Sequence, residues 1–88
     1  MSAASITLLY FARLRESLGS AREELVLPAG VNTLATLRTH LAARGGAWAE
    51  EMATGRKLRA AVNQTLVQGD APLKAGDEVA FFPPVTGG

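Results

Sequence analysis

The chain contains no cysteine among its 88 residues. A disulfide framework, a thiolate zinc site and a cysteine nucleophile are therefore excluded. Histidine is nearly as scarce, since His40 is the single one and no cluster of Asp, His or Cys accompanies it. We therefore assign His40 no catalytic role, and the sequence predicts no metal site.

The chain also lacks an excess of one charge and any long apolar run. Nine Lys and Arg residues against eight Asp and Glu leave a formal net charge of +1, whereas nucleic-acid-binding domains usually carry a concentrated basic face. No apolar run approaches the length of about 20 residues that spans a bilayer, and no basic region followed by an apolar stretch opens the chain. We therefore predict a cytoplasmic protein without a nucleic-acid or membrane partner.

Glycine-rich phosphate loops, internal repeats and interior linkers are missing as well. Gly45-Gly46 and Gly87-Gly88 lack the further glycines or the Gly-Lys-Ser/Thr ending of a nucleotide-binding loop. We therefore expect no tightly bound cofactor. A hydrophobic content of 48% with 19% charged residues is typical of a folded chain. The sequence predicts one small domain spanning residues 1–88.

What the chain does have is an unusual ending, FFPPVTGG at residues 81–88. Proline fixes φ and has no N–H, so Pro83 and Pro84 are expected to end a strand and to start an extended, unpaired tail over residues 83–88. Gly87 and Gly88 have no Cβ, and together they form a peptide thin enough for a narrow channel. At about 3.3 Å per residue, the six tail residues reach roughly 20 Å. The terminal carboxylate of Gly88 thereby becomes a group that the tail can deliver.

Hydrophobic periodicity predicts a mixed α+β domain. The predicted strands are residues 5–11, residues 24–27, a strand from residue 58 that turns near Asn63-Gln64 so that residues 65–67 fold back, and residues 78–82. The main helix begins at Asn32 or Thr33, runs to about Arg44 and is terminated by Gly45-Gly46, and shorter helical segments are expected at residues 14–18 and 47–53. This order is typical of a β-grasp fold, in which a mixed sheet packs on one main helix and the first and last strands are parallel neighbours.

Phe11, Leu66 and Phe82 belong to three different predicted strands. Patterning leaves two interpretations open: the three are ordinary core, or they meet on the sheet face opposite the helix. A sheet with one covering helix has a second face to bury, and a sizeable apolar patch there favours a protein partner.

Several charged groups are interpreted as surface. The adjacent acids Glu23-Glu24, Glu50-Glu51 and Asp77-Glu78 point apart in a strand or a helix, so we expect solvated side chains rather than catalytic pairs. The cluster of Arg56, Lys57 and Arg59 is either solubilising surface or a contact for an acidic partner.

Three segments resemble the small subunit of molybdopterin synthase: YFARLRE at residues 10–16, AVNQTLV at residues 61–67 and GDEVAFFPPVTGG at residues 76–88. The similarity spans essentially the whole chain except residues 1–4, which we expect to be disordered. The resemblance implies a ubiquitin-like β-grasp sulfur carrier.

The resemblance also implies the chemistry of Gly88. An ATP-dependent, E1-like activating enzyme would adenylate its carboxylate, and a sulfur donor would convert the product into a thiocarboxylate. An acyl-adenylate has the good leaving group that a carboxylate lacks. The thiocarboxylate would then pass its sulfur to cyclic pyranopterin monophosphate in the large subunit to form molybdopterin. ATP is used by the activating enzyme, so this chain itself needs no bound cofactor.

The same resemblance implies which residues meet the large subunit. They are the surface residues Phe11, Leu66, Phe82, Pro83 and Pro84, and the threading residues Val85, Thr86, Gly87 and Gly88. Two small and two large subunits are expected to form a heterotetramer. Its catalytic side chains are expected in the large subunit, so this chain is a sulfur-donating subunit rather than a complete enzyme.

Two alternatives stay open. Sulfur carriers for thiamine thiazole or tungsten-cofactor synthesis share the fold and the Gly-Gly ending, and binding to a different synthase would separate them. The other alternative is a ubiquitin-like modifier joined to lysines by isopeptide bonds, or a plain interaction domain with an inert carboxylate.

Overall fold

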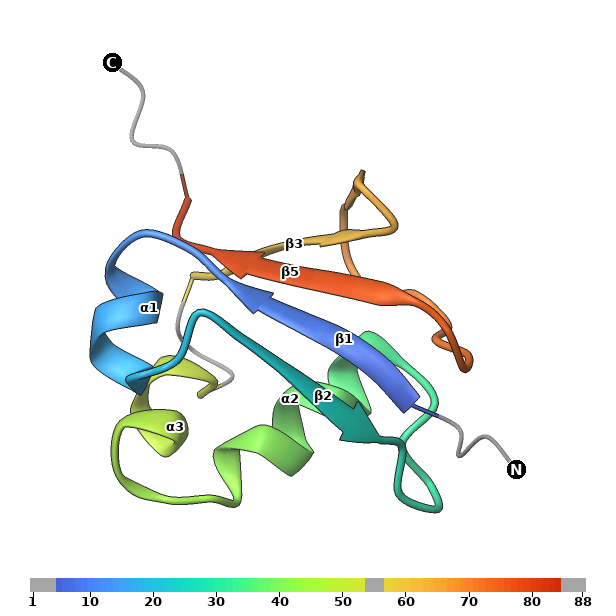
Figure 1. Cartoon of the computed structure of the whole chain (residues 1–88), viewed down its shortest axis with the longest axis horizontal. Coiled ribbons are helices and arrows are strands. Elements are labelled where there is room, and N and C mark those ends of the chain that lie inside the picture. Colours follow the sequence, from blue (N-terminus) through green and yellow to red (C-terminus); the bar gives the residue numbers. More distant parts are fainter. Residues whose placement is uncertain (1–4, 54–56, 85–88) are drawn as a thin grey trace.

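The structure is a computed structural model that describes residues 5–53 and 57–84. Its elements are β1 (Ser5–Tyr10), α1 (Arg13–Leu18), β2 (Arg22–Val26), α2 (Leu34–Ala42), α3 (Gly46–Glu51), β3 (Arg59–Val62), β4 (Thr65–Val67) and β5 (Glu78–Phe82) (Figure 1). The strands form one five-stranded sheet in the order β2-β1-β5-β3-β4. The predicted mixed sheet with a main helix is confirmed, whereas the expectation for residues 1–4 lies outside the described residues.

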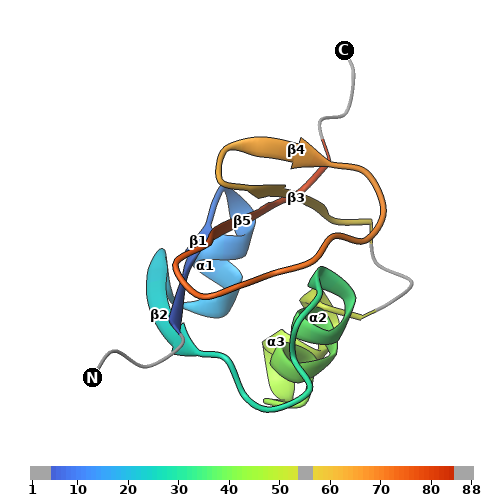
Figure 2. The ribbon, with the colours of Figure 1, turned by 90° about the vertical axis from the view of Figure 1, so that its right-hand side faces the viewer.

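The first and last strands are parallel neighbours, as predicted. Leu9 pairs with Ala80 and Tyr10 with Phe81, while β1 pairs antiparallel with β2 on its other side. β5 is the central strand because β3 pairs antiparallel with its second edge. Figure 2 shows the sheet and the helices as two layers.

The helices bury one face of the sheet. Alternate residues of each strand point to that face, and the fully buried side chains there and on the helices are Ile6, Leu8, Tyr10, Leu14, Leu37, Leu41, Val79 and Phe81. Trp48 and Met52 pack against this core, as the sequence predicted. Within the described ranges, no helix is long and apolar enough to cross a membrane.

The main helix is shorter than predicted. Thr33 caps α2 in a capping box with Thr36, which confirms the predicted start. The helix ends at Ala42, however, and Gly46 already belongs to α3 with Gly45 as its N-cap. Both glycines have positive φ, 82° and 54°, so they form the link between two helices instead of a simple stop. The helix therefore ends two residues before the predicted end at about Arg44.

The predicted turn at Asn63-Gln64 is confirmed and has two functions. Both residues have positive φ, 51° and 68°, as a two-residue hairpin turn matched to the sheet twist requires. The Asn63 side chain also donates to Asp77 Oδ1 (3.0 Å) and accepts from the Glu78 N–H (2.9 Å). Asp77 is 4% exposed, so its prediction as a solvated acid was wrong. Asn63 thereby ties the β3–β4 hairpin to the start of β5.

A second acid predicted to be solvated, Glu23, holds the sheet to the helical layer. The Tyr10 hydroxyl donates to Glu23 Oε2 (2.8 Å), and Arg44 donates to both carboxylate oxygens (2.9 and 3.0 Å). The Arg44 guanidinium also lies 4.3 Å from the ring centre of Trp48. Hydrogen bonds from Arg44 hold the pKa of Glu23 below its usual value. Glu23 is thus a structural acid.

The hydrogen bonds of Glu23 and Asp77 predict a loss of stability in acid. Hydrogen bonding from Asn63 lowers the pKa of Asp77, as Arg44 lowers that of Glu23. A depressed folded-state pKa means that the unfolded chain takes up the proton first, so this stability is present above about pH 4.3 and is lost as the pH falls further. Urea denaturation at about pH 6 and pH 3 should show the loss, and Glu23→Gln should show a smaller one. An equal loss in both proteins would contradict the assignment to Glu23.

Candidate functional site

The sheet face opposite the helices, here called the open face, carries the predicted site residues. Strand pairing arranges its side chains in rows across the strands. The middle row contains Arg22, Leu9, Ala80, Ala61 and Leu66, and the row at the end of β5 contains Phe11, Phe82 and Arg59.

Phe11 and Phe82 lie on neighbouring strands at this end row. The Phe11 N–H donates to the Phe81 carbonyl (3.1 Å), which extends the parallel pairing one residue past β1. Tyr10 and Phe81 point into the core, so alternation puts Phe11 and Phe82 on the open face. Phe11 is 49% exposed and Phe82 is half-buried. The open-face interpretation of these two residues is therefore the correct one.

Leu66 shares this face but is not adjacent to the phenylalanines. It is 50% exposed and pairs with Ala61 of β3, which in turn pairs with Ala80 of β5. β3 therefore lies between Leu66 and Phe82. The small side chains of the two alanines leave a shallow depression at the centre of the face, between Leu9 on one side and Leu66 on the other. Ala61 and Ala80 were not singled out from the sequence, although period-2 alternation within their strands would have placed them.

The tail begins at the same end of the open face. Pro83 and Pro84 follow β5 directly and are half-buried, which confirms that the strand ends at Phe82. Val85, Thr86, Gly87 and Gly88 lie outside the described residues, so their predicted threading stays a prediction. The described chain thus leaves the sheet beside Phe11 and Phe82.

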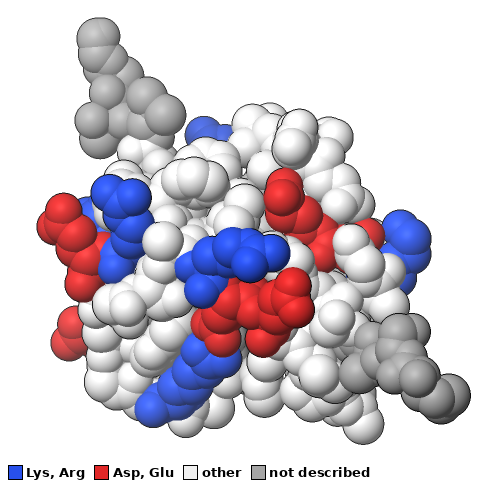
Figure 3. All heavy atoms as spheres, viewed as in Figure 1, with Lys and Arg blue, Asp and Glu red and all other residues white. Residues whose placement is uncertain are grey.

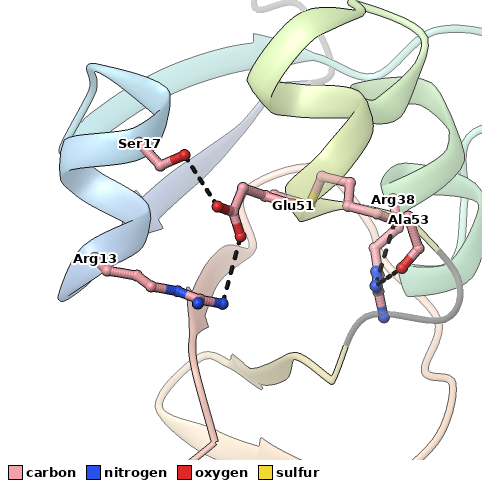
Figure 4. A network of polar contacts seen from close by, with 6 residues as sticks. Arg13, Ser17, Arg38, Glu51 and Ala53 are labelled. Carbon is pink, nitrogen blue, oxygen red and sulfur yellow. Dashed lines mark hydrogen bonds and ion pairs between the residues drawn. The ribbon is translucent and has the colours of Figure 1, made fainter.

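Glu51 anchors the helix that follows Phe11. The Ser17 hydroxyl donates to one Glu51 carboxylate oxygen (3.0 Å), and Arg13 approaches the other at 3.5 Å (Figure 4). Glu51 is 5% exposed, so its prediction as a solvated acid was wrong. Its partners are 34 and 38 residues away in the chain, which is why local patterning missed them. The contact fixes α1 against α3.

Ala12 forms a strained link between Phe11 and α1. Its φ of 57° and ψ of −135° fall in a region that residues with a Cβ rarely adopt. The flanking contacts leave it little freedom: the Leu14 N–H donates to the Phe11 carbonyl (3.2 Å) and the Arg15 N–H to the Ala12 carbonyl (3.1 Å). Leu14 is fully buried. The sharp turn at Ala12 therefore helps to fix the position of Phe11 at the end of β1.

The open face carries apolar side chains and mixed charges. In the part of the chain that the structure describes, no three His, Cys, Asp or Glu side chains cluster as metal ligands. On the side seen in Figure 3, Lys and Arg are interspersed with Asp and Glu. Among the predicted basic residues, Lys57 and Arg59 are exposed, and Arg56 is outside the described residues. What the arrangement offers chemically is an apolar face next to a tail.

A mixed five-stranded sheet with parallel first and last strands, helices on one face and a tail after the last strand defines the ubiquitin-like β-grasp class. The chain belongs to the ThiS family, whose model matches residues 8–88. The resemblance to molybdopterin synthase small subunits is thus confirmed by the family match and by the relatives.

Similar proteins are described as subunits of molybdopterin synthase or of the molybdopterin-converting factor. The molybdopterin synthase sulfur carrier subunit of Escherichia coli is 53% identical over 83 residues, which cover 94% of this chain and 99% of that protein. A putative molybdopterin converting factor subunit 1 from Pyrococcus furiosus superposes with a TM-score of 0.73 at 30% identity, covering 96% of this chain and 100% of that one. The complex of subunits 1 and 2 of the molybdopterin-converting factor from Helicobacter pylori contains a chain with a TM-score of 0.64 at 25% identity, covering 96% of this chain and 99% of that one.

Ala12→Gly is expected to stabilise the fold. Glycine adopts the Ala12 conformation without the penalty that a Cβ incurs, so the free energy of unfolding should rise by about 1 kcal/mol. The same substitution at the exposed helical Ala49 should lower it by about 1 kcal/mol. Chemical denaturation of both variants checks the prediction, and destabilisation by Ala12→Gly would show that Ala12 is not strained.

Proposed function

We propose that this chain is the sulfur carrier subunit of a molybdopterin synthase and that Gly88 carries the sulfur. The observation that carries the proposal is that the exposed Phe11 and the half-buried Phe82 lie side by side where β5 ends and the Pro83-Pro84 tail begins. The 53% identity to the Escherichia coli sulfur carrier subunit supports it. A tail fixed beside an apolar docking face is suited to delivering its terminal group into a partner.

The proposed chemistry takes place at the C-terminal carboxylate. A carboxylate resists nucleophilic attack, so the activating enzyme first joins it to AMP from ATP and releases pyrophosphate. A sulfide-level donor then attacks the carbonyl carbon, the bond to AMP breaks, and a thiocarboxylate and AMP result. The thiocarboxylate sulfur then bonds to cyclic pyranopterin monophosphate in the large subunit, its bond to the Gly88 carbonyl carbon breaks, and water restores the carboxylate. This chain contributes the carboxylate and the tail, while its partners contribute the nucleotide site and the catalytic side chains.

The open face is the proposed docking surface for the large subunit. Phe11, Leu66 and Phe82 offer apolar area to a partner, and Ala61 with Ala80 leaves a low centre that a bulky partner side chain fills. Pro83 and Pro84 continue the contact toward the mouth of the active site. Residues 85–88 thread into that site, where the two terminal glycines avoid any clash from side chains.

The proposal extends to the assembly. Two of these chains with two large subunits form the synthase, and the E1-like activating enzyme and the sulfur donor load the carrier between rounds. The proposed location is the cytoplasm. The complex of subunits 1 and 2 from Helicobacter pylori, which contains a chain of this fold, supports a two-subunit assembly.

Changes at Gly88 should abolish sulfur transfer without affecting the fold. A Cβ at the last residue, in Gly88→Ala, or a chain shortened by Gly88, misplaces the reacting carbon, and even a 1 Å error costs roughly 100-fold in rate. Molybdopterin formation is measured in a mixture of carrier, activating enzyme, ATP, sulfur donor and large subunit. Glu50→Gln, an exposed change on α3, is the control and should transfer normally. A folded, shortened chain that transfers sulfur normally would refute the proposal.

Phe82→Asp should weaken binding to the large subunit. Burying a charge in place of an aromatic ring costs about 2 kcal/mol or more, which is roughly 30-fold in Kd. Ala49→Asp is the control, because it adds the same charge at an exposed position of α3, in the helical layer away from the open face. Titration calorimetry should show a large effect for the first variant and a small one for the second. Equal Kd values for Phe82→Asp and the unmodified chain would remove Phe82 from the interface.

A further inference from the structure

Charged side chains on the open face are sorted by sign along the strands. At the tail end, where β5 finishes, Arg59 pairs with Phe82. At the far end, where β5 begins, Glu78 pairs with Thr7. The edge strand β2 repeats this order, since Arg22 pairs with Leu9 and Glu24 with Thr7. The basic groups therefore lie nearer the tail and the acidic groups farther from it.

Two of these charges have no competing ion pair among the residues that the structure describes. Arg59 is exposed, Glu78 is half-buried, and neither side chain makes an ion pair with any residue that the structure describes. Arg22 and Glu24 lie 3.6 Å apart, and their side chains are 62% and 63% exposed. Solvent weakens the attraction between Arg22 and Glu24. The basic member of this pair lies nearer the tail and the acidic member farther from it, as with Arg59 and Glu78. Phe82 lies four residues after Glu78 in β5, which separates the two ends by about 13 Å.

Phe11 and Phe82 mark the tail end of the open face, but the apolar middle row does not by itself fix a direction along the strands. In the middle row, Leu9 and Leu66 flank the two alanines on either side, so a partner's apolar side chain fits this row in either orientation along the strands. The tail must nevertheless meet the mouth of a channel at one end. An encounter in the reversed orientation places the tail away from that mouth.

Building on the proposed docking of the open face, we propose that this charge order orients the large subunit before the tail enters. The partner surface that fits is acidic beside the channel mouth, opposite Arg59, and basic about 13 Å away, opposite Glu78. The reversed encounter brings like charges together and is rejected. Arg59 and Glu78 are therefore specificity-determining residues of the docking surface, and their effect is mainly on the association rate.

The test compares charge reversals at the two ends. Association of each variant with the large subunit is followed by stopped-flow fluorescence at about 25 mM and about 500 mM salt. Arg59→Glu and Glu78→Lys should each slow association about threefold at low salt, and the double variant, which keeps the net charge, should slow it about tenfold. At high salt the differences should shrink toward unity because screening shortens the reach of each charge.

Matched variants separate local order from net charge. Glu50→Lys, on the exposed side of α3, changes the net charge as Glu78→Lys does and should leave the rate unchanged. Combining Arg59→Glu with Glu50→Lys restores the net charge and should still associate slowly. Wild-type rates for the double reversal at low salt would overturn the orientation proposal.

The same experiment distinguishes failure of the orientation proposal from failure of the proposed function. If Phe82→Asp abolishes binding while the charge reversals associate normally, the open face docks but its charges do not orient the partner. If the unmodified chain fails to bind the large subunit, both the docking and the orientation proposals are wrong.

Discussion

The parallel pairing of β1 with β5 is the constraint on which the rest of this structure depends. It joins the two ends of the described chain, so that Tyr10 and Phe81 stack in the core with ring centres 6.3 Å apart. One residue farther along, the same pairing sets Phe11 beside Phe82 on the other face. Because β5 is hydrogen-bonded on both edges, its end is held rigidly. The tail therefore starts from a fixed point next to an apolar surface.

The two faces of the sheet differ in what covers them. The inner face is covered by the helices, and two buried or half-buried acids, Glu23 and Glu51, fasten those helices to their neighbours by hydrogen bonds. The open face keeps exposed apolar side chains and, at its centre, small ones. Such an exposed patch costs solubility unless a partner covers it. In the proposed function, the open face docks on the large subunit and the tail delivers its terminal group, while the partner supplies the catalytic side chains.

The sequence predicted the elements that rest on local patterning. Alternation located β1 and β5, the threonine before Leu34 located the start of α2, and the residue pair Asn63-Gln64 located the hairpin turn. The Pro-Pro-Val-Thr-Gly-Gly ending together with the family resemblance singled out Phe11, Leu66 and Phe82, which lie on the open face that we propose as the docking surface. The same alternation, followed through β3 and β5, places Ala61 and Ala80 on it as well.

Contacts between residues that are distant in the chain could not be predicted from the sequence. Glu51, Asp77 and Glu23 look like surface acids beside another acid, and only the folded chain brings Ser17, Asn63 and Arg44 to them. The positive φ of Ala12 was equally hidden, because alanine has no preference for that conformation. Arg59 and Glu78 lie at opposite ends of the open face because of the strand register. The alternation of side chains along a strand shows which face a residue lies on, but it does not by itself set this register.

The central claim, that Gly88 carries sulfur, is tested most directly by the intact mass of the protein purified from its own host without oxidants, with fragmentation of the C-terminal peptide. Replacing one carboxylate oxygen by sulfur adds about 16 Da, close to the mass of an added oxygen, so accurate mass and localisation to Gly88 are both required. We expect a thiocarboxylate at Gly88 in a fraction of the molecules, and in more of them after incubation with ATP, the activating enzyme and a sulfur donor. A plain carboxylate that persists through that incubation, or adducts of Gly88 with lysine side chains in its place, would contradict the claim.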